Sequence, residues 1–367
     1  MRLTRLSLSN VRNYSTLDFS PAPGLNVFVG ENAQGKSNLL ESISLLGTGK
    51  SFRTSKESDL IREGFDLATI SGDAEVRAGA LRLSCSIGNG RRGTRKQYAV
   101  NGQSVRYAKF LGSIRVVTFI PADLQLVSGA PSLRRAMLNG ALSQDTPLYY
   151  RDLARYQKAL SQKAALLRGT IEPNPELLGV YNAILIEAGS ALILARRNFV
   201  TAVNAIAQQM HSEWIGNLER FEMRYQPNLP LSVPTLGGIA AVFTARLAEL
   251  GAIELLRKTT LVGPHRDDVE FLLDGRSLAA YGSQGQQRTA VLAIKIAEYT
   301  VMHERSGEAP LLLLDDVLSE LDAGRAQAFL AGVAGCEQAF ITATSLSPPL
   351  NGAHIHTISA ASLRPLS

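Results

Sequence analysis

Eight consecutive residues have the types and spacing of a phosphate-binding loop, G-x-x-x-x-G-K-[S/T]. They are Gly30, Glu31, Asn32, Ala33, Gln34, Gly35, Lys36 and Ser37. In such a loop the glycines let backbone N–H groups point at phosphate oxygens, and the N-terminus of the following helix adds a favourable dipole. Lys36 would reach the terminal phosphates of a nucleotide, and the Ser37 hydroxyl would bind Mg2+. The loop therefore predicts a site for a nucleotide and a magnesium ion.

Two carboxylates supply a second part of this chemistry. Asp315 and Asp316 follow four consecutive leucines, Leu311 to Leu314, a pattern typical of a fully buried strand. Ligands bind at the carboxyl ends of the strands in open α/β sheets, so both acids should lie beside the loop. We expect Asp315 to hold Mg2+ and Asp316 to orient or deprotonate an attacking water. Lys36 and Asp316 are thus the predicted catalytic residues.

A second helix start could also bind phosphate. The segment Tyr281 to Arg288 (YGSQGQQR) precedes an amphipathic pattern that runs from Ala290 to about Glu304. Ser283, Gly285 and the N–H groups at this helix start would form an anion site. Because the first loop already holds the phosphates within its own subunit, this second site is most useful if it contacts the nucleotide of a partner subunit.

The elements that would position these groups form an α/β domain with an insertion. An apolar strand at 25–29 precedes the loop, and a helix from Asn38 to Leu46 follows it, with Gly47 as its C-terminal cap. Alternating polarity predicts a hairpin within residues 1–29 and an antiparallel segment over about 66–120, which includes a strand at 114–120 and a turn at Asn101-Gly102. We expect residues 1–125 and 260–367 to form this domain.

Residues 126–259 should form a helical arm. Apolar residues alternate at three- and four-residue steps over four heptads, which predicts a long helix with a partner helix. The positions of this seam are Leu178, Tyr181, Leu185, Ala188, Leu192, Ala195, Phe199, Ala202 and Ile206. The preceding helical pattern, at 153–167, is the expected antiparallel partner.

Bulk composition restricts the environment of the protein. A chain of 367 residues is long enough for two domains, and 38 basic against 32 acidic residues leave a net charge of +6. This mild basic surplus permits a nucleic-acid partner without proving one. Cys85 and Cys336 lie at opposite ends of the chain, which fits a reducing cytosol and no zinc or disulfide framework. No run of 18 apolar residues occurs, so we expect a cytoplasmic protein outside the membrane.

Two groups of basic residues could contact DNA phosphates in a sequence-independent manner. They are Arg91, Arg92 and Arg95 at a hairpin tip, and Lys50, Arg53 and Lys56 at the exit of the helix after the loop. In both places a solvated surface loop is the alternative interpretation, and charges on an edge strand also discourage aggregation.

Several motifs together resemble the ABC-type ATPases of the SMC-like repair group. The resemblance rests on the Ser-x-Gly-Gln signature, the Asp-Asp strand end, and the segment Ser319 to Asp322 that follows it. Within that group the chain is similar to the RecF family of recombination-mediator ATPases. The segments that carry this similarity are Asn10–Tyr14 (NVRNY), Gly47–Arg53 (GTGKSFR), Gly263–Asp268 (GPHRDD), Gly282–Arg288 (GSQGQQR) and Leu312–Asp322 (LLLDDVLSELD).

The resemblance implies an ABC-type ATPase head, with a mixed sheet and an antiparallel β subdomain, and an inserted helical arm. It implies ATP and Mg2+ as cofactors, with Arg12 and Asn38 added to the ATP site. Ser283, Gly285, Gln286 and Asp322 would contact ATP bound to the other subunit of a homodimer. The dimer would bind double-stranded DNA and single-strand/double-strand junctions, release them on slow hydrolysis, and act with RecR and RecO to load RecA.

Some positions depart from ABC-type ATPases in general. Asp316 replaces the usual glutamate with a shorter carboxylate, which predicts slow turnover. The usual switch histidine is missing, which leaves Thr344 as a candidate γ-phosphate sensor, and Gln125 is an uncertain candidate for the Q-loop. His265 could be held by hydrogen bonds alone or could take part in chemistry. A small-molecule kinase or a transporter-type ATPase subunit is the alternative function, although a kinase would not need the Ser283 signature.

Overall fold

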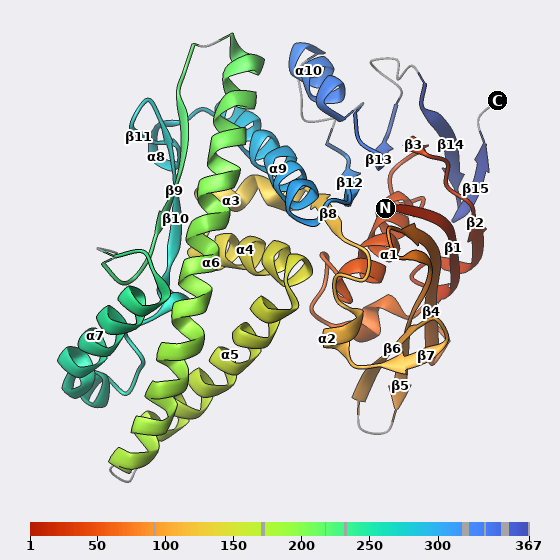
Figure 1. The fold of residues 1–367 in the computed structure, drawn as a ribbon. Helices are drawn as coiled ribbons and strands as arrows, with labels where there is room; N and C mark the ends of the chain where they lie inside the picture. Colours follow the sequence, from red (N-terminus) through yellow and green to blue (C-terminus); the bar gives the residue numbers. More distant parts are fainter. Residues whose placement is uncertain are drawn as a thin grey trace. The chain divides into compact units, whose positions relative to one another are not determined.

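The computed structural model describes residues 1–90, 93–169, 173–216, 218–230, 233–317, 323–333, 335–345 and 352–365. The chain forms two compact units (Figure 1). The first unit combines Met1–Leu124 with Arg288–Ser367, and the second is Gln125–Gln287. The expected division placed 260–287 with the first unit. These residues lie in the second unit because strand β10, within them, pairs with strand β9 of that unit.

A six-stranded sheet in the first unit carries the predicted phosphate-binding loop. Its strand order is β15-β14-β3-β13-β12-β8, and all neighbours are parallel except β14 and β15. The bounds are β3 Gly24–Val29, β8 Val116–Phe119, β12 Leu311–Asp315, β13 Gln338–Ala343, β14 His354–Ser359 and β15 Ser362–Pro365. Every residue of β12 and β13 is buried, as their apolar sequences predict for strands covered on both faces.

A second six-stranded sheet in this unit is antiparallel, with the order β2-β1-β4-β5-β6-β7. The bounds are β1 Arg2–Val11, β2 Tyr14–Phe19, β4 Leu67–Val76, β5 Gly79–Gly90, β6 Gly93–Val100 and β7 Gln103–Val105. The predicted turn at Asn101-Gly102 joins β6 to β7, with left-handed φ angles of 50° and 78°. The strand expected at 114–120 is absent from this sheet, because β8 pairs with β12 in the parallel sheet instead.

Helix α1 (Lys36–Thr48) follows the loop and contacts strands of both sheets. Its apolar side chains belong to one buried cluster that includes residues from the two sheets. Gly47 was expected to cap this helix, but the cap is Gly49, whose φ is 63°. Gly47 is required by packing, because a Cβ atom there would lie 2.5 Å from the Val116 side chain. The other elements are η1 Glu57–Leu60, α2 Tyr107–Phe110, η2 Pro121–Leu124, α10 Ala323–Val333, and α9 Gln284–Ser306, which begins in the second unit.

The second unit contains helices and a small sheet with the order β11-β10-β9. Its helices are α3 Gln125–Ser128, α4 Pro131–Asp145, α5 Pro147–Arg168, α6 Pro175–Ile215, α7 Leu236–Arg257, η3 Pro264–Arg266 and α8 Leu278–Tyr281. Its strands are β9 Phe221–Gln226, β10 Asp268–Leu273 and β11 Arg276–Ser277. The arm is therefore not entirely helical.

Helix α6 is the long helix of the arm, and it packs against α5, the partner expected from the sequence. The predicted seam is buried at Leu185, Ala188, Leu192 and Phe199. Beyond Phe199 the fully buried positions move to Val203 and Ala207, one residue later than the seam predicts. A straight helix with 3.6 residues per turn drifts from a 3.5-residue repeat, which explains the shift.

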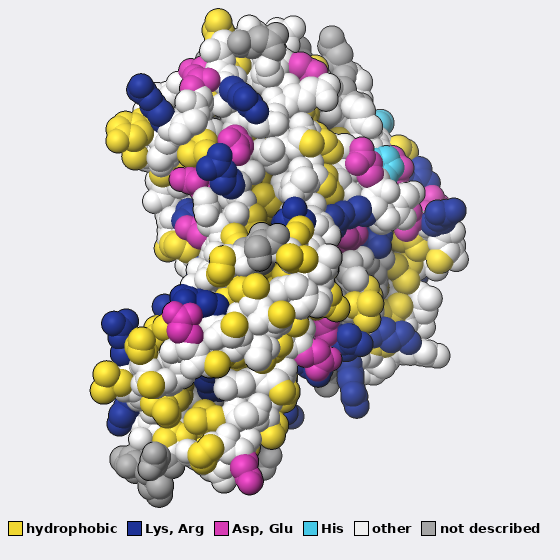
Figure 2. Space-filling view, turned by 60° about the vertical axis from the view of Figure 1, so that its left-hand side comes forward, with side chains coloured by type: hydrophobic (Ala, Val, Ile, Leu, Met, Phe, Trp, Pro, Cys, Tyr) yellow, Lys and Arg dark blue, Asp and Glu magenta, His cyan; other side chains and the backbone are white. Residues whose placement is uncertain are grey.

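By length and composition α6 is also the one helix among the described residues that could cross a membrane. Its most apolar 18-residue window has a mean hydropathy of 1.8, and 33% of that window is buried. Core helices of soluble proteins pass the same test, and α6 contacts α5, α7 and β9. Apolar side chains do reach the surface of this unit (Figure 2), among them Val180 and Leu256, which are 54% and 83% exposed.

Candidate nucleotide-binding site

The phosphate-binding loop connects β3 to α1 at the carboxyl end of the parallel sheet. Glycine is required at two positions of the loop, because neighbouring atoms lie too close for a Cβ atom. A Cβ atom on Gly30 would lie 2.3 Å from the Ile358 carbonyl oxygen, and one on Gly35 would lie 2.9 Å from the Asn13 side chain. Gly35 also has a left-handed φ of 114° at the N-cap of α1. The loop therefore presents its backbone, with little side-chain bulk, at the start of a helix.

Lys36 is buried and folds back over the loop. Its Nζ atom donates hydrogen bonds to the carbonyl oxygens of Gly30 and Glu31, the latter at 2.9 Å. Burial lowers the pKa of the Lys36 ammonium group from its ordinary value, and the negative charges of Asp316 and Asp315 partly offset this effect. The loop thus holds a cation that phosphate oxygens could draw away from the two carbonyls.

Asp315 receives two hydroxyl donors on one oxygen. Ser37 Oγ and Thr342 Oγ1 donate to Asp315 Oδ1 at 2.8 and 2.7 Å. The backbone N–H of Asp316 donates in turn to Thr342 Oγ1 at 2.9 Å. Strand register explains this arrangement, because Asp315 on β12 is opposite Thr342 on β13. The loop and both strand ends are therefore joined by one hydrogen-bond network.

Thr342 was missed in the sequence, where Thr344 was the candidate sensor. Thr344 is exposed, beyond the end of β13, whereas Thr342 is fully buried. A hydroxyl in a strand that is otherwise almost entirely apolar, QAFITA, was the available signal. It could be interpreted only once the pairing of β13 with β12 was known.

The oxygens of Ser37 and Asp315 fit a magnesium ion. Mg2+ prefers oxygen ligands, usually one or two from the protein together with water and substrate phosphates. Within the described part of the chain no group of three or more His, Cys, Asp or Glu residues could hold a metal ion. A magnesium site in which phosphate oxygens supply most of the ligands agrees with this preference of Mg2+ and with the lack of a larger cluster in the described residues.

A cavity of about 300 Å3 lies over these groups. The residues that line it are Asn13, Asn32, Ala33, Gly35, Lys36, Ser37, Asn38, Arg53, Asp315, Asp316 and Thr342. Arg53, which we grouped with possible DNA contacts, is among them, and its guanidinium donates to the Asn38 side chain. The cavity thus collects two cations and two carboxylates from three separate stretches of sequence.

Arg12, expected in this site, does not line the cavity. Its guanidinium forms a bidentate pair with the Glu41 carboxylate, with both N–O distances at 2.9 Å. The Glu41 side chain is 1% exposed, so Arg12 satisfies a buried charge. Gln34 does not line the cavity either, and its side-chain oxygen accepts a hydrogen bond from the Ala360 N–H in the turn between β14 and β15.

The other basic residues occupy different surroundings. Lys50 lies 5.8 Å from the centroid of an aromatic ring, Lys56 is 3.5 Å from an aspartate carboxylate, and Arg95 is exposed. Arg91 and Arg92 lie outside the described residues.

The signature segment forms a capping box at the start of α9 in the second unit. Ser283 Oγ accepts a hydrogen bond from the Gln286 N–H at 3.2 Å, and Gln286 Oε1 accepts one from the Ser283 N–H at 2.7 Å. The Gln286 amide also donates to the Glu219 carboxylate at 2.6 Å. Gly285 lies in the first turn of the same helix. Asp322 and the three residues before it are outside the described part of the chain.

The GPHRDD segment is part of a buried polar network. The Arg196 side chain is 2% exposed and donates to the Pro264 carbonyl oxygen at 2.6 Å and to Asp267 Oδ2 at 3.0 Å. It also donates to the side chains of Tyr149 and Asn139. This arginine therefore joins α4, α5 and the GPHRDD turn to α6 within the second unit.

His265 lies in the same turn. Its Nδ1 atom is 2.6 Å from the Tyr156 hydroxyl, and its Nε2 atom is 3.3 Å from the Thr260 carbonyl oxygen. Burial lowers the pKa of the imidazole to about 4, so it is neutral at pH 7. Both ring nitrogens of His265 are thus satisfied by hydrogen-bond partners within the second unit.

These features define a class of protein. A phosphate-binding loop beside an acid-terminated buried strand, with an antiparallel sheet against the loop helix and an inserted unit, is an ABC-type ATPase head of the SMC-like group. The fold is shared with a solved SMC head bound to the C-winged helix domain of ScpA, at 14% identity and a TM-score of 0.58, covering 100% of this chain and 98% of that one.

A family model described as the RecF/RecN/SMC N terminal domain matches residues 2–351. The DNA replication and repair protein RecF of Symbiobacterium thermophilum is 42% identical over 355 residues, which cover 94% of this chain and 92% of that protein. A solved structure described as the recombination mediator protein RecF-ATP in the RecFOR pathway has 33% identity and a TM-score of 0.91, covering 100% of this chain and 98% of that one. The chain belongs to the RecF family.

Proposed function

We propose that this protein is an ATP-binding and ATP-hydrolysing protein of DNA replication and repair. The observation that carries the proposal is the Asp315 carboxylate, which two hydroxyls from the loop and β13 contact beside the buried Lys36. This is the arrangement that Mg2+-dependent nucleotide hydrolysis needs. The RecF-ATP structure supports ATP as the nucleotide.

The loop and the strand ends would have different roles in binding and hydrolysis. Backbone N–H groups of the loop and the Lys36 ammonium would bind the β- and γ-phosphates. Ser37 and Asp315 would hold Mg2+, which when bound neutralises phosphate charge. Asp316 would orient or deprotonate the attacking water. Its carboxylate is one methylene shorter than a glutamate, so we propose slow turnover.

The second half of the site would come from another copy of the chain. In the capping box, Ser283 Oγ accepts a hydrogen bond from the Gln286 N–H, which leaves its O–H able to donate to a phosphate. Ser283, Gly285, Gln286 and Asp322 would thus contact ATP bound by the partner subunit. ATP would then stabilise a homodimer by mass action, because it binds the dimer more tightly than the monomer.

The dimer would bind double-stranded DNA and junctions between single- and double-stranded DNA. Hydrolysis would release it, and with RecR and RecO it would help to load RecA at gaps. The relatives named as replication and repair proteins and the RecFOR pathway of the solved structure support this role. Candidate phosphate contacts are Lys50, Arg53, Lys56, Arg91, Arg92 and Arg95.

Sedimentation velocity tests the dimer. We expect wild type to be a monomer without nucleotide and a dimer with ATP and Mg2+, and Ser283→Arg to remain monomeric while still binding ATP. A wild-type protein that stays monomeric at saturating ATP, or a Ser283→Arg variant that dimerises normally, would contradict ATP-dependent dimerisation through the Ser283 segment. Retention of labelled duplex DNA only in the presence of ATP would separate this function from that of a small-molecule kinase.

A further inference from the structure

Strands β14 and β15 form a hairpin, and its turn, Ala360-Ala361, contacts the phosphate-binding loop directly. The Ala361 N–H donates to the Gln34 carbonyl oxygen at 3.0 Å, and the Ala360 N–H donates to Gln34 Oε1 at 2.6 Å. The Asn13 side-chain amide donates to the same carbonyl oxygen at 3.3 Å. Gln34 is therefore held through both its backbone and its side chain.

These contacts determine the orientation of one peptide group in the loop. In a trans peptide the carbonyl oxygen and the N–H of the next residue point in opposite directions. Donors from Ala361 and Asn13 hold the Gln34 oxygen on their side, so the Gly35 N–H must face the other side. The next peptide is fixed in the same way, because the Gly35 carbonyl oxygen accepts from the Tyr14 hydroxyl at 3.1 Å.

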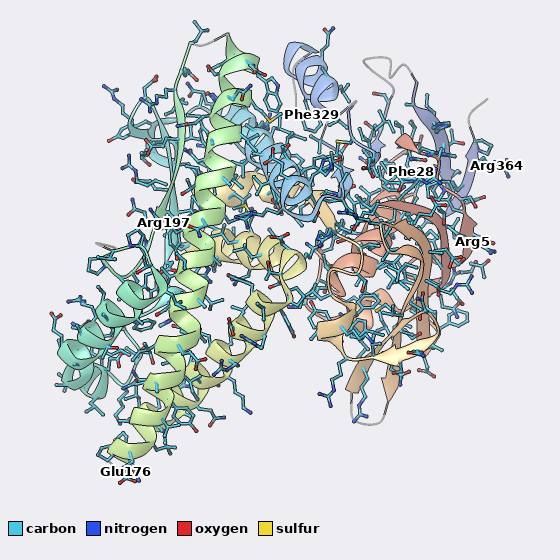
Figure 3. All side chains as sticks on the ribbon, viewed as in Figure 1. Arg5, Phe28, Glu176, Arg197, Phe329 and Arg364 are labelled. Carbon is cyan, nitrogen blue, oxygen red and sulfur yellow. The ribbon has the colours of Figure 1, made fainter. Side chains whose placement is uncertain are left out.

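The hairpin is well placed for this role. Strand β14 pairs in parallel with β3, which leads into the loop, and the Ile358 carbonyl oxygen lies against Gly30. Phe28 on β3 and Arg364 on β15, both labelled in Figure 3, belong to the same sheet. The hairpin backbone thus reaches the first residue of the loop as well as Gln34.

The turn itself has a conformation that alanine disfavours. Ala360 and Ala361 have φ angles of 47° and 58°, in the left-handed region where Asn and Gly are usual. Strained backbone of this kind persists only where the surroundings impose it, and it concentrates near functional sites. The two-residue connection between the paired residues Ser359 and Ser362 requires these angles, and they leave both N–H groups of the turn on Gln34.

We propose that the Ala360-Ala361 turn is a positioning element of the nucleotide site, which orients the Gln34–Gly35 peptide so that the Gly35 N–H faces the phosphates. The proposal rests on the proposed function, because it requires that ATP binds at this loop. The hydrogen bonds from the turn to the loop both end on Gln34, so we expect the turn to act on nucleotide binding through the position of that residue.

Two variants of the turn separate the role of its donors from that of its sequence. Ala361→Pro removes the N–H that contacts Gln34, and proline cannot adopt a φ of 58°. The double variant Ala360→Asn/Ala361→Gly keeps both N–H groups and favours both φ angles. Binding of a fluorescent ATP analogue with Mg2+ is measured for each, with thermal unfolding of the nucleotide-free protein as a check on folding. We expect Ala361→Pro to bind about tenfold more weakly, because one oriented hydrogen bond to a charged phosphate is lost, and the double variant to bind within about twofold of wild type.

A measurement on wild type keeps the test independent of folding in the variants. Hydrogen exchange of the peptide covering the turn should slow when ATP and Mg2+ are added. A wild-type affinity in Ala361→Pro, equal losses in both variants, or unchanged exchange at the turn would overturn the proposal. Failure of wild type to bind ATP at all would instead remove the proposed function.

Discussion

Substitution of Thr342 by valine tests the network around Asp315 at its least exposed member. The Thr342 side chain is fully buried, and its hydroxyl both donates to Asp315 Oδ1 at 2.7 Å and accepts from the Asp316 N–H at 2.9 Å. Valine has nearly the same shape but neither function. A buried N–H without a partner costs about 1–3 kcal/mol, and a lost hydrogen bond to a charged group contributes about 1.5–3 kcal/mol. We expect Thr342→Val to reduce the free energy of unfolding by roughly 3 kcal/mol.

The same change should affect hydrolysis more than binding. The bond from the Asp316 N–H fixes the peptide that carries the proposed water-orienting carboxylate. Loss of this bond should weaken transition-state stabilisation, and each ~1.4 kcal/mol that is lost slows hydrolysis tenfold. We expect the rate of phosphate release to fall at least about tenfold, while ATP affinity, which depends on the loop and Lys36, changes less than about threefold.

Thr342→Ser is the matched control, because serine keeps the hydroxyl and loses only a methyl group. Urea unfolding followed by circular dichroism and steady-state phosphate release are measured for both variants. The serine variant should remain within about 1 kcal/mol of wild type and keep most of its activity. If the valine and serine variants behave alike in both assays, the Thr342 hydroxyl is not the reason for the geometry at Asp315.

Two further predictions concern the second unit, whose Trp214 is the single tryptophan of the chain and so reports its unfolding by fluorescence. Asp267→Asn should lower the free energy of unfolding by about 3–5 kcal/mol, because it leaves the buried Arg196 guanidinium without its charge partner. The surface variant Glu187→Ala should be far less destabilising, and similar small losses in both variants would contradict this. The pKa of His265 is lowered by burial to about 4, below the ordinary 6.5, so the unfolded state binds the extra proton and stability should rise with pH between these values. We expect wild type to lose roughly 2 kcal/mol between pH 7 and pH 5 from this group, and His265→Gln to lack that part of the slope.

Local patterns in the sequence were sufficient for the parts of the site that are contiguous. The loop motif, the buried strand that ends in Asp315, and the turn at Asn101-Gly102 each depend on a few neighbouring residues whose backbone preferences are strong. The structure forms all three. The capping box at Ser283 is also local, and its S-x-x-Q spacing is visible in the chain.

The remaining parts depend on which strands become neighbours, and sequence patterns do not determine that. Thr342 matters because β13 lies beside β12, and Ala361 matters because β14 lies beside β3. Arg53 follows the helix that the loop begins, yet its guanidinium returns to the cavity to contact Asn38. Arg12 shows the converse, because it was expected in the nucleotide site but pairs with the buried Glu41 carboxylate on α1 and does not line the cavity.

Asp316 connects these observations to the rate of hydrolysis. Asp315 Oδ1 already accepts two hydroxyl hydrogen bonds, and the same residue is the expected Mg2+ ligand, so it is a poor base. We therefore propose Asp316 as the base, and its φ of 52° lies in a region that aspartate and asparagine tolerate better than longer side chains do. The backbone thus favours a short carboxylate at the position where a longer one would reach water more easily. The proposed slow hydrolysis agrees with that geometry, and it would keep ATP bound long enough for the proposed nucleotide-dependent dimer to act before it dissociates.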